Sequence, residues 1–83
     1  MTTAAPSGDL SFATVGAALA AHGGATVLDL AAVSRVDSAG LSLLLELTRR
    51  AKARGAGLEI RNASEQVRGL ASFFGVDSLL NFQ

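Results

Sequence analysis

Few residues of this 83-residue chain are of types that could do covalent chemistry. Asp37 and Ser38 are neighbours and superficially resemble an acid beside a nucleophile, but a serine nucleophile needs a base to take its proton. The single histidine, His22, falls at a predicted helix C-terminus, where a partly cationic imidazole is favourable. The chain has no cysteine, and one histidine without clustered carboxylates does not make a metal site. The sequence therefore predicts a protein that is not an enzyme and that uses no metal ion or other cofactor.

Phosphate binding is not indicated either. The glycines of Gly23-Gly24 and Gly55-Ala-Gly57 are too few and wrongly placed for a P-loop or a dinucleotide-binding loop. Free backbone N–H groups at Ser38–Leu41, where a helix is predicted to begin, could hold an anion, but the carboxylate of Asp37 would repel it. We therefore consider binding modules ahead of enzymes.

Composition and charge limit the class of protein further. The length predicts one small domain, and its core must consist of Leu, Val, Ala and Phe because the chain has no Trp or Tyr. Seven acidic residues balance seven basic ones, so no overall field would steer nucleic acid or an anionic membrane toward the chain. Residues 1–8 lack the basic start of a signal peptide, and the Ala-rich run Phe12–Ala21 is too short to span a membrane. We expect a cytoplasmic chain with a flexible tail over residues 1–8 and one domain over residues 9–83.

Hydrophobic periodicity predicts the elements that position Asp37 and Ser38. Thr26–Ala31 is a short apolar run typical of a strand, and a polar loop follows it. A Leu-rich helix is predicted over Leu41–Arg54, and either Asp37 or Ser38 could cap its N-terminus. Leu58–Arg61 alternates apolar and charged residues, which predicts a second strand with one partly solvated face. The two strands should be parallel and joined by a right-handed crossover.

Two more helices and an apolar C-terminal end complete the predicted fold. Ser11 is expected to cap a helix over Phe12–His22 that ends in left-handed glycines at Gly23-Gly24. Asn62 is expected to cap the last helix as part of a capping box with Glu65. The helix stripe after this box and the apolar residues at the chain end are Val67, Leu70, Ala71 and Phe74, then Leu79, Leu80 and Phe82. The predicted class is α/β, with helices packed on a small mixed β-sheet.

The helix predicted over Leu41–Arg54 has a wide apolar arc, about 200° against a little over 100° for an ordinary surface helix. Two interpretations are open. A shallow domain could wrap more of this helix, or part of the arc could contact another protein. Gly40 would allow another chain to approach the start of the helix closely, because it has no side chain.

The motif Asp-Leu-x-x-Val-x-x-Val-Asp-Ser-x-Gly-Leu-x-Leu-Leu, from Asp29 to Leu44, resembles the signature of STAS domains, the small α/β modules of sulfate transporters and anti-sigma-factor antagonists. The continuation Leu-Glu-Leu-x-Arg-x-Ala-x-x-x-Gly and the ending Gly-Val-x-x-Leu-Leu are most similar to the MlaB-like branch. The similarity runs from about Gly8 to Leu80. STAS domains usually begin with one or two strands, of which only Asp9–Phe12 could remain here.

The resemblance implies a function. The MlaB-like branch is the small cytoplasmic subunit of the ABC transporter that maintains lipid asymmetry of the Gram-negative outer membrane. By resemblance, this chain would bind the ATPase subunit of such a phospholipid transporter, within a complex that contains a membrane permease. It would be peripheral to the inner membrane, without inserting into it and without binding nucleic acid. The expected contact residues are Asp37, Ser38, Ala39, Gly40, Leu41 and Leu45.

The resemblance also implies an alternative, an anti-sigma-factor antagonist in a partner-switching phosphorylation pathway. In those proteins the motif reads Asp-Ser-Ser-Gly, and the second serine is phosphorylated by the partner kinase. Ala39 aligns with that serine and has no hydroxyl, whereas Ser38 aligns with the first serine. The usual phosphorylation site is therefore expected to be absent, and Ser38 is the weaker candidate. MlaB-like proteins have Ser or Thr at the Ser38 position, in the contact with the ATPase subunit.

Overall fold

A sheet of four short parallel strands forms the base of the fold. The computed structural model of the chain describes residues 3–83. The strands, in the order in which they pair, are β1 (Thr3–Ala4), β3 (Val27–Asp29), β5 (Glu59–Arg61) and β6 (Asn81–Phe82). A separate two-stranded parallel sheet pairs β2 (Gly8–Leu10) with β4 (Val33–Val36).

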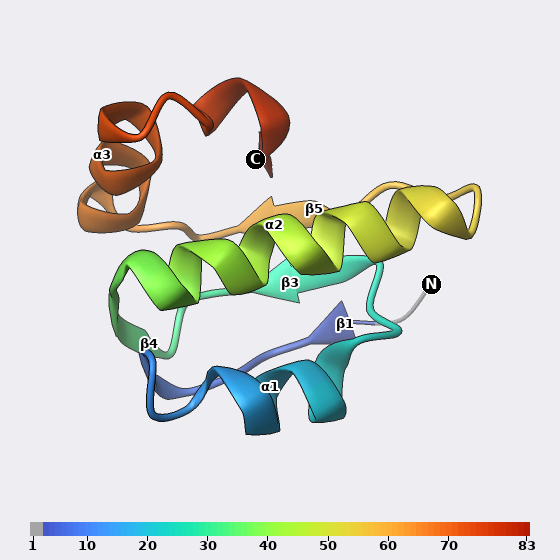
Figure 1. The fold of residues 1–83 in the computed structure, drawn as a ribbon, viewed down its shortest axis with the longest axis horizontal. Coiled ribbons are helices and arrows are strands. Elements are labelled where there is room, and N and C mark those ends of the chain that lie inside the picture. Colours follow the sequence, from blue (N-terminus) through green and yellow to red (C-terminus); the bar gives the residue numbers. More distant parts are fainter. Residues whose placement is uncertain (1–2) are drawn as a thin grey trace.

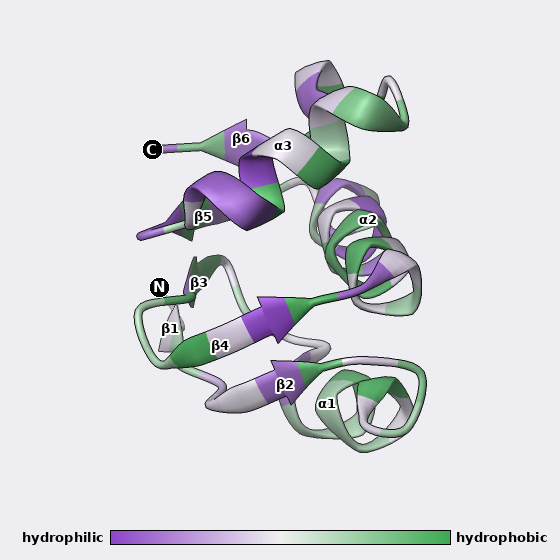
Figure 2. Cartoon of the chain, turned by 90° about the vertical axis from the view of Figure 1, so that its left-hand side faces the viewer, coloured by the Kyte–Doolittle hydropathy of each residue, from purple (hydrophilic) through white to green (hydrophobic). Residues whose placement is uncertain are grey.

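The helices lie on one face of the four-stranded sheet (Figures 1 and 2). They are α1 (Val15–His22), α2 (Ser38–Ala53) and α3 (Glu65–Phe73), and a 3-10 turn, η1 (Asp77–Leu79), follows α3. The central helix is α2, which packs between α1 and α3. Figure 1 shows α3 beside the end at which α2 begins. The two ends of α2 therefore have different neighbours.

The core lies between this sheet and α2. The register places Ala4 beside Leu28, Leu28 beside Ile60, and Ile60 beside Phe82. The first three of these side chains are buried, as are the α2 residues Leu44, Leu47 and Ala51. Because side chains alternate between the two faces of a strand, Glu59 and Arg61 point away from the helices. They form an exposed ion pair of 2.8 Å on the solvated face, and the predicted partly wet face of this strand is thus confirmed.

The main predicted elements are confirmed. The strand β3 falls within Thr26–Ala31, β5 falls within Leu58–Arg61, and the two are parallel neighbours. The Leu-rich helix is α2, and the α/β class is correct. All pairings among the described strands are parallel, whereas the sequence led us to expect a mixed sheet.

The predicted start of the first helix and its predicted left-handed stop are wrong, although the helix does end at His22. The backbone N–H of Ser11 donates to Thr14 Oγ1, and the carbonyl of Ser11 accepts from Thr14 and Val15. These bonds make a turn of residues 11–14, so α1 begins at Val15 and Phe12 is 85% exposed. At the other end Gly23 has φ −59°, which is right-handed, so the predicted left-handed stop is absent there.

The predicted cap of α3 is also wrong. Ser64 is the N-cap, and its Oγ accepts from the N–H of Val67 at 3.3 Å. Asn62 has φ +59°, and its side-chain amide donates to Asp29 Oδ1 at 2.9 Å. The side chain of Asn62 therefore binds the end of β3 and does not cap α3. The predicted helix stop at Gly75 is confirmed by its φ of +71°.

The two ends of the chain both join the sheet. β6 and the buried side chain of Leu80 confirm that the apolar C-terminal end folds back. The flexible tail predicted over residues 1–8 does not agree with the structure from Thr3 onward, because β1 pairs with β3 and Ala4 is buried. Met1 and Thr2 lie outside the described residues.

The sequence predicts a polar loop where the structure has β4. Residues 33–36 form a strand because they pair with β2.

Candidate functional site

The N-terminus of α2 is held by the side chain of Asp37. This residue is the N-cap, and its Oδ1 accepts from the N–H of Gly40 at 2.8 Å. Its Oδ2 accepts from the N–H of Phe12 at 3.1 Å. The bond from Gly40, with a smaller contribution from Phe12, holds the pKa of the Asp37 carboxyl below its ordinary value. Both oxygens thus serve backbone groups of the same chain, which leaves Asp37 poorly placed to act as a base for Ser38.

Gly40 is explained by a close contact within the chain. A Cβ added there would lie 2.1 Å from the carbonyl oxygen of Leu10 and 2.8 Å from Cγ1 of Val36. The same carbonyl of Leu10 accepts from the N–H of Asp37 at 3.2 Å. The close approach that the sequence predicted at Gly40 therefore exists, but the approaching strand is β2 of this chain and not another protein.

Five of the six expected contact residues form two groups, and Ala39 belongs to neither. Asp37 and Gly40 face β2 through the bonds and contacts just described. Ser38, Leu41 and Leu45 lie along the other side of α2, where they line one groove. Ala39 is half-buried and does not line this groove.

The groove on this side of α2 is shallow and mostly apolar. It has a volume of about 250 Å³. Its lining residues, which together we call the α2 groove, are Ser38, Leu41, Ser42 and Leu45 from α2 and Phe74 and Val76 from the segment after α3. The α2 residues are three or four positions apart and therefore share one face of the helix. Leu41 is buried at the floor, whereas Ser38 and Ser42 are exposed at the rim.

Exposed aromatic side chains lie on both sides of the N-terminus of α2. Phe73 is 83% exposed and Phe74 52% exposed, and their rings make an edge-to-face contact with centroids 5.3 Å apart. Phe12, which is held by Asp37, is exposed on the side of α1. Exposed apolar groups gathered in this way typically mark protein contacts.

Three residues of the α2 groove, Ser42, Phe74 and Val76, are not among those predicted from the sequence. Ser42 could have been found, because it follows Ser38 by four positions on a predicted helix. Phe74 was assigned to the core on the basis of its spacing, and Val76 was not considered. The helix ends at Phe73, and the left-handed Gly75 turns the chain, so Phe74 and Val76 lie against α2 at the groove instead.

Other kinds of site find no support in the part of the chain that the structure describes. Within residues 3–83, no group of three or more His, Cys, Asp and Glu side chains is placed to hold a metal ion. His22 is the last residue of α1, as the sequence predicted. None of the described helices is long and apolar enough to cross a membrane.

Comparison with known families places the chain. The family described as Mlab, STAS domain matches residues 5–81, nearly the whole sequence. The chain belongs to this STAS domain family. In this STAS domain the matched range includes every residue that lines the α2 groove.

Individual relatives agree with this assignment. The chain is 40% identical over 53 residues to the intermembrane phospholipid transport system binding protein MlaB of Escherichia coli (strain K12), and equally to that of Shigella flexneri. Each match covers 64% of this chain and 55% of the relative, so the chain spans about half the length of the curated relatives it matches.

Two solved structures share the fold. The anti-sigma factor antagonist SpoIIAA, in its unphosphorylated form, has a TM-score of 0.73 at 21% identity, over 98% of this STAS domain and 77% of that chain. A sulfate transporter family protein from Wolinella succinogenes has a TM-score of 0.77 at 17% identity, over 98% and 75%. At these identities the likeness concerns the fold alone.

Proposed function

We propose that this STAS domain is a non-catalytic subunit of a phospholipid-transporting ABC system and that it binds the ATPase subunit through the α2 groove. The chain would support assembly or activity of a complex that also contains a membrane permease. It would be cytoplasmic and held at the inner membrane by its partners. The similarity to MlaB supports the transport system, and the exposed apolar groove beside Ser38 supports a protein contact.

The exposed groove is the single observation that carries the proposal. Leu41 and Leu45 provide an apolar floor, and Phe74 provides a half-exposed aromatic wall. Large aromatic groups around a pocket are the usual anchors of protein interfaces. Phe12 and Phe73 extend the apolar surface on either side. A partner that covered this surface would remove three exposed Phe side chains from water, which favours association.

The test replaces Ser38 on the rim of the groove. Because Asp37 and not Ser38 is the N-cap, Ser38→Arg should leave folding nearly unchanged. A long cation at the rim obstructs the partner and must lose water, and overpacking of this kind costs about 1–3 kcal/mol. We expect a roughly 5- to 150-fold loss of affinity for the purified ATPase subunit by calorimetry. The smaller Ser38→Asn should weaken binding less.

Ser7→Arg is the matched control. Ser7 is exposed in the loop between β1 and β2, outside the α2 groove, and the substitution makes the same change in size and charge. It should bind like the unaltered chain. Urea unfolding of each variant separates loss of binding from loss of folding. Tight binding by a folded Ser38→Arg variant would contradict the proposal.

The alternative function, that of an anti-sigma-factor antagonist, depends on phosphorylation of the chain. It requires a phosphate on Ser38, because Ala39 has no hydroxyl. Ser38 is exposed at the first turn of α2, where the helix dipole favours a phosphate, but the ionised Asp37 next to it opposes one. Intact-mass measurement after incubation with an anti-sigma kinase and ATP decides between the two. We expect no gain in mass, and one phosphate on Ser38 would favour the alternative.

A further inference from the structure

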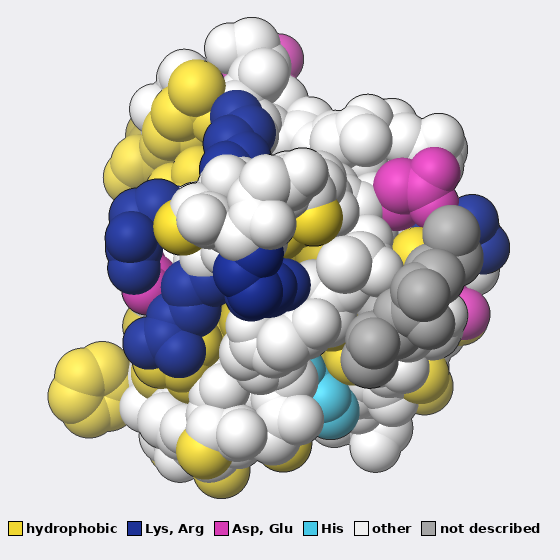
Figure 3. Space-filling view, turned by 90° about the vertical axis from the view of Figure 1, so that its right-hand side faces the viewer, with side chains coloured by type: hydrophobic (Ala, Val, Ile, Leu, Met, Phe, Trp, Pro, Cys, Tyr) yellow, Lys and Arg dark blue, Asp and Glu magenta, His cyan; other side chains and the backbone are white. Residues whose placement is uncertain are grey.

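The charges of this chain are separated in space although they balance in number. Residues 46–54 of α2 and its end contain four cations and one carboxylate, which gives +3. The rest of the chain has three cations and six carboxylates, which gives −3. Figure 3 shows the side of the molecule at which α2 ends, where Lys and Arg side chains gather beside hydrophobic ones. The zero net charge therefore conceals a strongly cationic region, which we call the cationic patch: Arg49, Arg50, Lys52 and Arg54.

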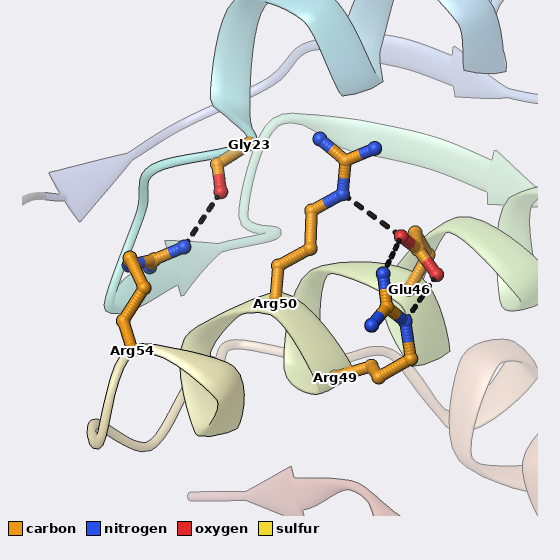
Figure 4. Close-up of polar contacts among 5 residues, drawn as sticks. All are labelled: Gly23, Glu46, Arg49, Arg50 and Arg54. Atoms are coloured by element: carbon orange, nitrogen blue, oxygen red, sulfur yellow. Dashed lines mark hydrogen bonds and ion pairs between the residues drawn. The ribbon is translucent and has the colours of Figure 1, made fainter.

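Glu46 neutralises only part of this patch. Arg49 binds its carboxylate through two nitrogens, at 2.7 and 2.9 Å, and Arg50 Nε binds it at 2.8 Å (Figure 4). The hydrogen bonds from Arg49 and then Arg50 lower the pKa of Glu46 to about 2. Glu46 is thus ionised at neutral pH, and its single negative charge is shared between two guanidinium groups.

The other two cations, Lys52 and Arg54, are not neutralised by a carboxylate among the described residues. Arg54 donates to the carbonyl of Gly23 at 3.1 Å and to that of Ala25 at 3.2 Å (Figure 4 shows the first bond), and carbonyl groups carry no net charge. Lys52 is exposed and forms no ion pair with any residue of the described range 3–83. Cations in the last turn of a helix are favoured by its dipole. That effect accounts for cations at this end of the helix but not for the hollow that Arg49 and Lys52 line.

Two residues of the cationic patch, Arg49 and Lys52, lie next to the α2 groove. A second hollow is lined by Leu45, Thr48, Arg49, Lys52 and Leu79. It shares Leu45 with the α2 groove, and Leu79 on its wall is 56% exposed. The distance along the helix from Leu45 to Lys52 is two turns, or roughly 10 Å. One partner segment lying along α2 would therefore meet an apolar surface first and cations next.

We propose that the α2 groove continues into a second binding site, formed by Arg49, Lys52 and Leu79, that holds an acidic segment of the protein partner. The identity of that partner as an ATPase subunit rests on the proposed function. A protein segment fits better than a membrane or a nucleic acid, because Arg49 and Lys52 are interspersed with the apolar side chains of Leu45 and Leu79 and the net charge of the chain is zero. Opposite charges placed in this way accelerate encounter and fix orientation.

Binding to the purified ATPase subunit at low and at physiological salt tests the second site. Lys52→Glu should lower the affinity about tenfold at low salt, mainly through the association rate. The difference from the unaltered chain should shrink as salt screens the patch. Arg61→Glu is the control, because it changes the net charge equally but lies on the sheet face that points away from α2. Equal effects of the two variants, or binding that responds to neither Lys52→Glu nor salt, would overturn the inference.

A second probe makes the outcome independent of the proposed function. The peptide Leu-Glu-Glu-Glu-Glu, titrated into isotopically labelled protein, should shift the amide signals of residues 45–54 in the unaltered chain and not in Lys52→Glu. If the ATPase subunit does not bind but the peptide does, the proposed function fails and the acidic-segment site stands. If the peptide shifts no signal in that range, the site is refuted. Binding of the protein alone to anionic vesicles, lost in Lys52→Glu, would also refute it in favour of a membrane surface.

Discussion

Each helix begins with backbone N–H groups that lack an acceptor within the helix, and the N-termini of α2 and α3 obtain one in different ways. At α2, Asp37 caps the helix at 2.8 Å and also binds the loop before α1 through Phe12. At α3, a hydroxyl of Ser64 caps at 3.3 Å and binds nothing else that the structure shows, while Asn62 reaches across to Asp29. The cap residue of α2 thus binds a distant loop as well as its own helix, whereas the cap residue of α3 binds only its own helix. The first turn of α3 is instead fixed to β4 by Gln66, which accepts from the N–H of Val36 at 3.1 Å and donates to its carbonyl at 2.6 Å.

The difference also explains the two glycines of these helices. Gly40, in the first turn of α2, leaves room for the carbonyl of Leu10. Gly69, in the middle of α3, has no atom within 4 Å of the position that a Cβ would take. One glycine is required by tertiary contact, and the other has no structural need to be glycine.

The largest effect should come from Gly40→Ala. The added methyl group would overlap the Leu10 carbonyl, so β2 or α2 must move, and we expect a loss of about 3 kcal/mol or more in urea unfolding. Gly69→Ala is the matched control in α3 and should instead stabilise by about 0.5–1 kcal/mol, because alanine favours the helix. A neutral Gly40→Ala variant would show that the strand is not fixed against α2.

Asp37→Ala should have the next largest effect. It removes the cap and the bond to Phe12 together, so its cost should lie between those of Gly40→Ala and Ser64→Ala.

Asp37→Asn should keep most of the cap but change how the free energy of unfolding depends on pH. Because the folded pKa of Asp37 lies below 3.8, the carboxylate contributes stability above that pH, and this contribution is lost as the pH falls through the folded pKa. Urea unfolding at pH 7 and at pH 3 should therefore show that the free energy of unfolding falls less at the lower pH in Asp37→Asn than in the unaltered chain.

The smallest effect should come from Ser64→Ala. Loss of a single long cap bond should cost about 0.5–1 kcal/mol in urea unfolding. Asn62→Gly should change stability by less than about 0.5 kcal/mol, because glycine accepts the positive φ and only an exposed bond to Asp29 is lost. If Ser64→Ala were neutral and Asn62→Gly cost more than Ser64→Ala, the cap of α3 would be the residue that the sequence first suggested.

Much of the fold and part of the site could be predicted because the signals are local. The apolar run at Val27–Asp29, the repeating leucines of α2 and the left-handed Gly75 act through neighbours a few positions away. β4 could not be predicted, because Ser34 and Arg35 have no strand pattern of their own and pairing with β2 decides their conformation. Phe12 was misplaced for a related reason. The turn of residues 11–14 keeps residue 12 outside α1, and the N–H of Phe12 donates to Asp37, which is distant in sequence.

The sequence by itself determined the class of the fold and the order of its main elements, and it indicated that Gly40 would allow a close approach to the start of α2. Only the tertiary structure decided that this neighbour is the carbonyl of Leu10 and that Asp37 is occupied by the backbone of its own chain. It also decided that Arg49 and Lys52 share a hollow with Leu79, which follows α3 in the sequence. The physical reason is range: helix turns, caps and strand alternation depend on nearby residues, whereas close packing depends on which distant segments the sheet brings together.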